Sequence, residues 1–124
     1  MHEARYGVGW AWQNQKQYDQ AVNAYNQVVG GTATETAAKA QVQIGLCRLE
    51  QKRHADGINA LLIVPFSYDY PELNAVALCE AARALVELKQ REHAERLLQR
   101  VIKEHPESKW ADIARSRLES LRGG

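Results

Sequence analysis

The sequence predicts an all-α protein, a right-handed α-solenoid of three tandem helix pairs followed by one capping helix. The main observation is a repeat, because four columns of small or apolar residues recur with successive steps of 36 and 37 residues. A period of this length is typical of stacked units that bury their apolar faces against one another. Inside each unit the apolar residues follow helical spacing. The columns are Gly9, Gly45, Ala82; Ala21, Gly57, Ala94; Tyr25, Leu61, Leu98; and Val28, Val64, Val101.

Length and composition predict one domain over residues 1–124. The 124 residues are 45% hydrophobic and 25% charged, which suits a small chain with a single core. The formal net charge of +1 provides no broad basic field, so we expect no nucleic-acid partner. No apolar run approaches the roughly 20 residues that span a bilayer, so no membrane insertion is expected. The expected repeats are about 2–31, 34–66 and 71–106, with a capping helix over about 108–122.

The first unit is predicted to contain two helices joined by a polar turn at Gln15, Lys16 and Gln17. Lys16 belongs to a further column, with Lys52 and Lys89 at the same steps. Gly30 and Gly31 are expected to end the second helix, because glycine adopts the left-handed conformation without a Cβ penalty.

The second unit is expected to begin with a capping box formed by Thr32 and Glu35, with Thr34 as the alternative cap. Its partner helix is expected from about His54 and should stop before Pro65, which cannot continue the backbone ladder.

The third unit is predicted to start at Pro71, since proline suits the first helical position, and to end at Pro106. The stretch from Ser108 to Leu121 carries a single apolar stripe. A lone amphipathic helix in this place is typical of a solenoid that covers its apolar end.

The small residues of the columns predict close crossings between the helices of each pair. Replacing Ala21 or Ala94 by a large side chain should therefore cost about 1 to 3 kcal/mol. Cys47 and Cys79 lie in apolar contexts, which favours free, buried thiols over a disulfide.

An aromatic segment between Pro65 and Pro71 contains Phe66, Tyr68 and Tyr70. These rings either cover the seam between the second and third units, which we favour, or contact a partner.

Catalysis has little support in the sequence. The Gly7-Val8-Gly9 run lacks a third glycine and a preceding strand, so it does not indicate a phosphate loop. The four histidines have no partners at metal-ligand spacing. We therefore expect no enzyme, no cofactor and no metal site.

The first unit resembles the tetratricopeptide repeat pattern through Gly9, Trp12, the run Tyr18-Asp19-Gln20-Ala21, Tyr25 and Val28. The later units depart from it, because Arg48 and Leu85 replace the first aromatic residue and the repeat steps exceed the usual 34. The stretch over residues 104–111 is similar to the linker of repeats in bacterial cell-envelope proteins such as the Tol-Pal coordinator family. That similarity implies a cell-envelope or periplasmic location, for which the chain carries no signal of its own.

The resemblance implies a noncatalytic module that binds a peptide or helix of a partner protein. The ligand would lie in a concave groove lined by the first helix of each pair. An alternative is a structural scaffold or self-association segment, in which the aromatic N-terminal helix pair packs on another repeat or on a second copy. The expected groove residues are Tyr6, Trp10, Gln13, Val42, Leu46, Glu50, Arg83 and Glu87.

Overall fold

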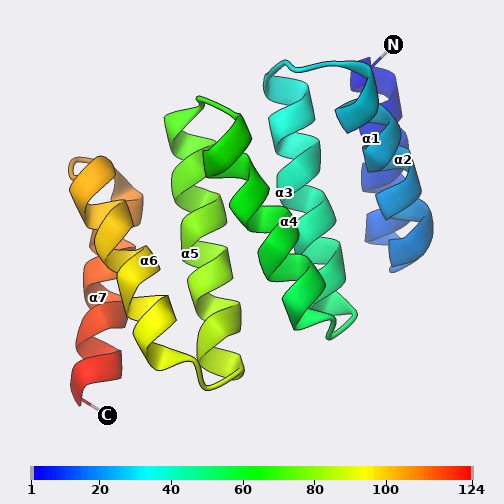
Figure 1. The fold of residues 1–124 in the computed structure, drawn as a ribbon. Coiled ribbons are helices and arrows are strands. Elements are labelled where there is room, and N and C mark those ends of the chain that lie inside the picture. The colour runs from blue at the N-terminus through cyan, green and yellow to red at the C-terminus, as the bar shows by residue number, and fades with distance from the viewer. Residues whose placement is uncertain (1, 124) are drawn as a thin grey trace.

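The computed structural model describes residues 2–123, which form an array of seven helices and no strand (Figure 1). This architecture confirms the predicted solenoid of helix pairs. The helices are α1 (His2–Asn14), α2 (Tyr18–Gly31), α3 (Glu35–Glu50), α4 (His54–Ser67), α5 (Pro71–Glu87), α6 (Arg91–Glu104) and α7 (Lys109–Gly123).

The helices form two rows that differ in how closely they pack. Each helix contacts the next one along the chain, and α1, α3, α5 and α7 also contact one another in that order. Within residues 2–123, α2, α4 and α6 make no such contacts with one another. Because only one row is in continuous contact, that row is the shorter, inner side of the array. We call α1, α3, α5 and α7 the inner row.

The turn inside each pair has the same left-handed geometry. Lys16, Lys52 and Lys89 have φ angles of 62°, 64° and 63°. In each turn, the amide that follows the lysine donates a hydrogen bond of 2.9 Å to the carbonyl five residues earlier. This pattern is a Schellman motif, in which the left-handed residue is most often glycine. The lysine column therefore marks helix ends.

The helix ends on either side of the loop between α2 and α3 lie where expected, but the expected capping mechanisms were wrong. Gly30 and Gly31 belong to α2, and no glycine among the described residues has a positive φ. The helix ends instead because Thr32 is extended, with φ −158° and ψ 160°. Thr34, the alternative cap, occupies the N-cap position of α3, and its side chain makes no capping bond. The amide of Thr34 donates to Thr32 Oγ1 at 3.4 Å, so the box between Thr32 and Glu35 does not form.

The expected stop before Pro65 was also wrong, because α4 continues through this proline to Ser67. Proline's fixed φ is itself helical, so near a helix end its cost is mainly one lost donor. The last turn is still closed by the amide of Tyr68, which donates to the carbonyl of Val64 at 3.0 Å. As a result Phe66 is 91% exposed and does not cover the seam. Tyr68 and Tyr70 are partly buried.

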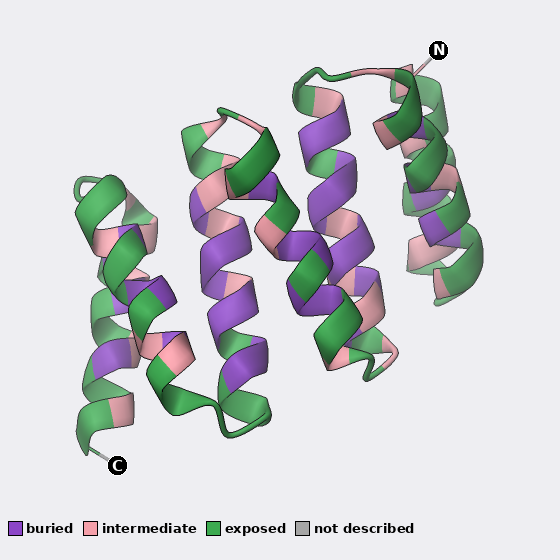
Figure 2. Ribbon diagram, in the orientation of Figure 1, coloured by how far each residue is buried: buried purple, intermediate pink, exposed green. Residues whose placement is uncertain are grey.

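The helices of each pair cross closely where the columns place small residues. A Cβ added to Gly9 would lie 2.6 Å from Tyr25 Cε1, and one added to Gly45 would lie 2.5 Å from Leu61 Cγ. Figure 2 shows that the buried residues lie on the faces where helices meet. The predicted close crossings are therefore present in the first two units.

The capping helix and the cysteines agree with expectation. Ser108 Oγ accepts a hydrogen bond from the amide of Ala111 at 3.2 Å, which satisfies one donor at the start of α7. The buried residues of α7, Ala111, Ala114 and Leu118, face the rest of the array. Cys47 and Cys79 are free and buried. Burial raises the pKa of each thiol to about 11.

Candidate protein-binding groove

Successive helices of the inner row present accessible side chains at equivalent positions. These positions recur with the same steps of 36 and 37 residues, so the side chains form columns across the row. Every member is exposed or partly exposed, and we call the whole set the inner groove. Its columns are Glu3, Lys39, Val76; Gly7, Gln43, Glu80; Trp10, Leu46, Arg83; and Asn14, Glu50, Glu87.

At the α1 end, an aromatic cluster supports the groove. Trp10 is 49% exposed, which leaves much of its ring free for contact. Tyr6 lies partly buried behind it, with its ring centroid 5.4 Å from that of Tyr25 and the planes tilted by 53°. Burial raises the pKa of Tyr6, so the phenol stays neutral over the physiological range. Trp10 is therefore the main apolar contact that α1 offers.

Gln13 links the first three helices. The Tyr25 hydroxyl donates to Gln13 Oε1 at 2.6 Å, and Gln13 Nε2 donates to Gln43 Oε1 at 3.0 Å. Burial raises the pKa of Tyr25, which keeps this hydroxyl a donor. Gln13 thus positions the helices beneath the groove.

Val42 was expected in the groove but has no surface to offer. It is only 3% exposed, because its position points into the contact between neighbouring inner helices. On α3 the partly exposed Leu46 provides the apolar contact instead, with Glu50 exposed at the end of the helix.

At the α5 end, the groove is charged and its charges are paired. Arg83 forms ion pairs with Glu80 at 2.9 Å and with Glu87 at 3.3 Å. Glu87 also meets His54 Nε2 at 2.7 Å, a bond that joins α4 to α5. This hydrogen bond is the main cause that lowers the pKa of Glu87, and the charge of Arg83 adds to it. Glu87 therefore remains a carboxylate at neutral pH.

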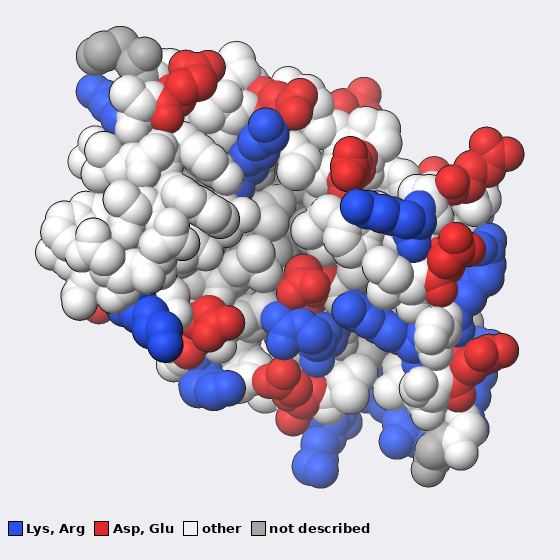
Figure 3. All heavy atoms as spheres, turned by 180° about the vertical axis from the view of Figure 1, so that it is seen from behind, with Lys and Arg blue, Asp and Glu red and all other residues white. Residues whose placement is uncertain are grey.

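Figure 3 shows the face of the inner row. The surface toward α1 is largely uncharged, whereas acidic and basic groups alternate toward α5 and α7. A partner that crossed the whole row would meet an aromatic end first and a mixed-charge end last.

Some accessible positions were not among the expected groove residues. Gln43 and Glu80 share one column, and both are partly exposed. Arg117 of α7 reaches the same face, where it donates to the carbonyl of Cys79 at 3.1 Å. The repeat spacing could have revealed the first two, since they lie at the same steps as Gly7. The third lies a further 37 residues after Glu80, so the same spacing, extended to α7, could have revealed it too.

Within residues 2–123, no three His, Cys, Asp or Glu side chains come together as metal ligands. None of the described helices is long and apolar enough to cross a membrane.

Comparison with known families agrees with the helical repeat. Residues 3–30 and 77–108 each match the family model described as tetratricopeptide repeat. These two segments, which together cover just under half of the chain, are similar to tetratricopeptide repeats. The first match covers α1 and most of α2, and the second covers α6 and much of α5. Tetratricopeptide repeats generally mediate interactions between proteins and are typically noncatalytic. No curated protein matches the chain closely enough to count as a relative.

Proposed function

We propose that this chain binds a peptide or helix of a partner protein in the inner groove. The observation that carries the proposal is the column Trp10, Leu46, Arg83, which places an aromatic, an aliphatic and a cationic side chain on consecutive inner helices. Tryptophan and arginine are enriched among the residues that dominate interface energies. Around this column, Tyr6 and Gln13 fix the α1 end.

The test begins with selection of binding peptides from a random library displayed on phage, followed by affinity measurements on synthetic copies. Trp10→Ala should weaken binding at least tenfold, because an aromatic anchor that becomes buried in an interface contributes about 2 kcal/mol or more. Leu46→Ala should weaken it less. Val8→Ala is the matched control, because Val8 lies on the same helix, is 51% exposed and is absent from the groove columns. Unchanged affinity in Trp10→Ala and Leu46→Ala, with intact folds, would reject the proposal.

A second candidate function is association through the end face of the array, which is the side of α1 that carries Arg5 and Val8. Val8 is exposed on this face, whereas its equivalents Ile44 and Ala81 are 7% and 0% exposed because a preceding unit covers them. The same comparison holds for Arg5, which is exposed while its equivalents Gln41 and Leu78 are buried. This face thus has the form of a repeat interface without its neighbour.

Sedimentation equilibrium tests this second candidate. Self-association should appear as a mass that rises with concentration above 14.0 kDa and should be abolished by Val8→Asp. Trp10→Ala is the control that leaves association unchanged. A strictly monomeric chain at high concentration would reject self-association and leave the groove as the binding surface.

On the similarity of residues 104–111 to cell-envelope linkers, we also propose a cell-envelope or periplasmic location. When the chain is expressed with its natural leader region in a bacterium, detection in the periplasmic fraction would agree with this location, and confinement to the cytoplasmic fraction would reject it.

A further inference from the structure

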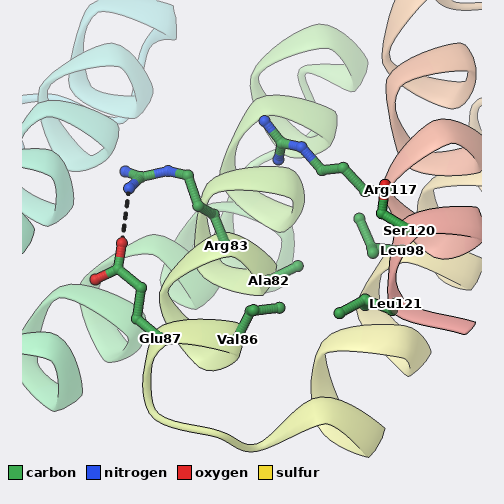
Figure 4. Close-up of a pocket in the computed structure, with 8 residues that line it drawn as sticks. All are labelled: Ala82, Arg83, Val86, Glu87, Leu98, Arg117, Ser120 and Leu121. Carbon is green, nitrogen blue, oxygen red and sulfur yellow. Dashed lines mark hydrogen bonds and ion pairs between the residues drawn. The ribbon is translucent and has the colours of Figure 1, made fainter. Parts of the chain in front are cut away.

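A cavity of about 290 Å³ lies between α5, α6 and α7, at the last step of the inner row (Figure 4). Ala82 and Leu98, from the columns that cross in this unit, form its floor. Val86, which is 40% exposed, and Leu121 form its apolar walls. Ligand pockets usually measure about 300–1,000 Å³, so this one has room for a side chain rather than for a large ligand.

The two arginines at the rim differ in how many acidic partners they have. Arg83 is held by two carboxylates of its own helix, Glu80 and Glu87. Arg117 forms no ion pair within residues 2–123, and its one hydrogen bond goes to the carbonyl of Cys79. A guanidinium has five N–H donors, so most of its capacity is available to an anion. The rim therefore offers one guanidinium without an acidic partner, while the two carboxylates on Arg83 balance the two arginines in net charge.

The charge lies at a distance from the apolar walls. Figure 4 shows the Arg117 side chain extending away from Leu121 and Val86. Its partner Cys79 precedes Val86 by seven residues on α5, or about 10 Å along the helix axis. A C-terminal residue carries its carboxylate on the same Cα as its side chain. If its apolar side chain filled the cavity, that carboxylate would fall short of Arg117. In an extended chain, side chains two residues apart share a face and lie about 7 Å apart before their own reach is added.

We infer that the cavity binds an extended acidic segment of the partner, with an apolar side chain in the cavity and an Asp or Glu two residues away on Arg117. This inference deepens the proposed groove function by naming the chemistry of the partner's anchor. The guanidinium of Arg117 selects the acidic residue, and the apolar walls of the cavity select the apolar residue two positions away.

Three capped tripeptides test the assignment by titration of the ¹⁵N-labelled full chain in NMR. Acetyl-Leu-Ala-Glu-amide should shift the amides of Val86, Ser120 and Leu121. Acetyl-Leu-Ala-Gln-amide, which lacks the charge, should bind about three- to tenfold more weakly, the range expected for a partly exposed charge-assisted bond. Acetyl-Ala-Ala-Glu-amide should bind more weakly still, because it leaves the cavity empty.

Arg117→Gln should abolish the preference for the Glu peptide. Arg115→Gln is the matched control, because Arg115 lies on the same helix but pairs with Asp112 at 3.0 Å. Ser120→Leu, at an exposed position on the rim, should fill the cavity and reduce binding of all three peptides. The amide spectra of the variants report their folds directly.

Equal affinity for the Glu and Gln peptides, or a preference that survives Arg117→Gln, would overturn the inference. N-acetylleucine is a further probe, because tight binding of this compound would assign the site to a chain's C-terminal residue instead. None of these probes needs Trp10 or Leu46. Failure of the tripeptides with intact capture of longer peptides would therefore reject the cavity alone, and the reverse would reject the groove.

Discussion

Replacement of Gly45 by alanine tests the close crossing of α3 and α4. The added Cβ would lie 2.5 Å from Leu61 Cγ and 3.1 Å from the carbonyl oxygen of Gly57. Leu61 is fully buried, so its branch point cannot swing aside into solvent. The backbone of α4 would have to move away from α3 instead.

The magnitude follows from two opposing terms. Alanine is favoured over glycine inside a helix by about 1 kcal/mol. Overpacking a tight contact costs about 1–3 kcal/mol, and a clash at a buried branch point lies toward the upper end. We expect Gly45→Ala to lower the free energy of unfolding by about 1–2 kcal/mol. For a domain of this size that corresponds to a melting temperature roughly 4–8 °C lower.

Gly7→Ala is the matched control. Gly7 lies inside α1, and a Cβ added there would meet nothing within 4 Å. Only the helix-propensity gain remains, so this variant should be stabilised by about 1 kcal/mol. Urea titration followed by circular dichroism measures both variants. If Gly45→Ala is as stable as the wild type or more stable, the close-crossing explanation of the column is refuted.

Three further predictions concern the turns, the thiols and an inter-unit bond. Lys52→Gly should raise the free energy of unfolding by about 0.5 kcal/mol, because the relief of left-handed strain exceeds the cost of the extra chain entropy of the unfolded state. Lys52→Val should lower it, and urea titration distinguishes the two variants. With a pKa of about 11, a buried thiol such as that of Cys47 is about one part in a thousand thiolate at pH 8, so mass spectrometry should show alkylation only after unfolding. Hydrogen bonds from Gln51 and Arg48 lower the pKa of Asp19. The ionised Asp19 therefore stabilises the fold above its ordinary pKa near 3.8, and this stabilisation is lost as the pH falls through the lowered pKa. The difference in free energy of unfolding between the wild type and Asp19→Asn should vanish in acid.

The order of the helices was predictable from the sequence because the fold repeats. Two helices per unit, the polar turns and the crossing columns all follow from residues that recur at fixed steps. The conformation of the lysine turns did not follow, although the lysine column was visible. Glycine is the residue that usually signals a left-handed helix end, and here Gly30 and Gly31 lie in α2 while Lys16 occupies the turn.

The groove was only partly predictable, because the direction of a side chain depends on packing between units. Val42 and Leu46 are one helical turn apart on α3, yet Val42 is buried by a neighbouring inner helix and Leu46 remains accessible. Arg117 follows Glu80 by a further step of 37 residues, so the repeat spacing, extended to α7, would have placed it on the inner row. Contacts that involve the capping helix required the three-dimensional structure.

The two ends of the array are built differently, and this contrast is why both the groove and the end face require testing. In a solenoid each helix is buried only by its neighbours, so terminal helices have an uncovered side. At the C-terminal end, α7 buries Ala111, Ala114 and Leu118 and presents Arg115 and Glu119 outward. At the other end, α1 has a single buried residue, and its apolar side chains remain partly exposed. An apolar outer face favours contact with a neighbour more than a polar one does, so we expect the proposed association at α1 rather than at α7.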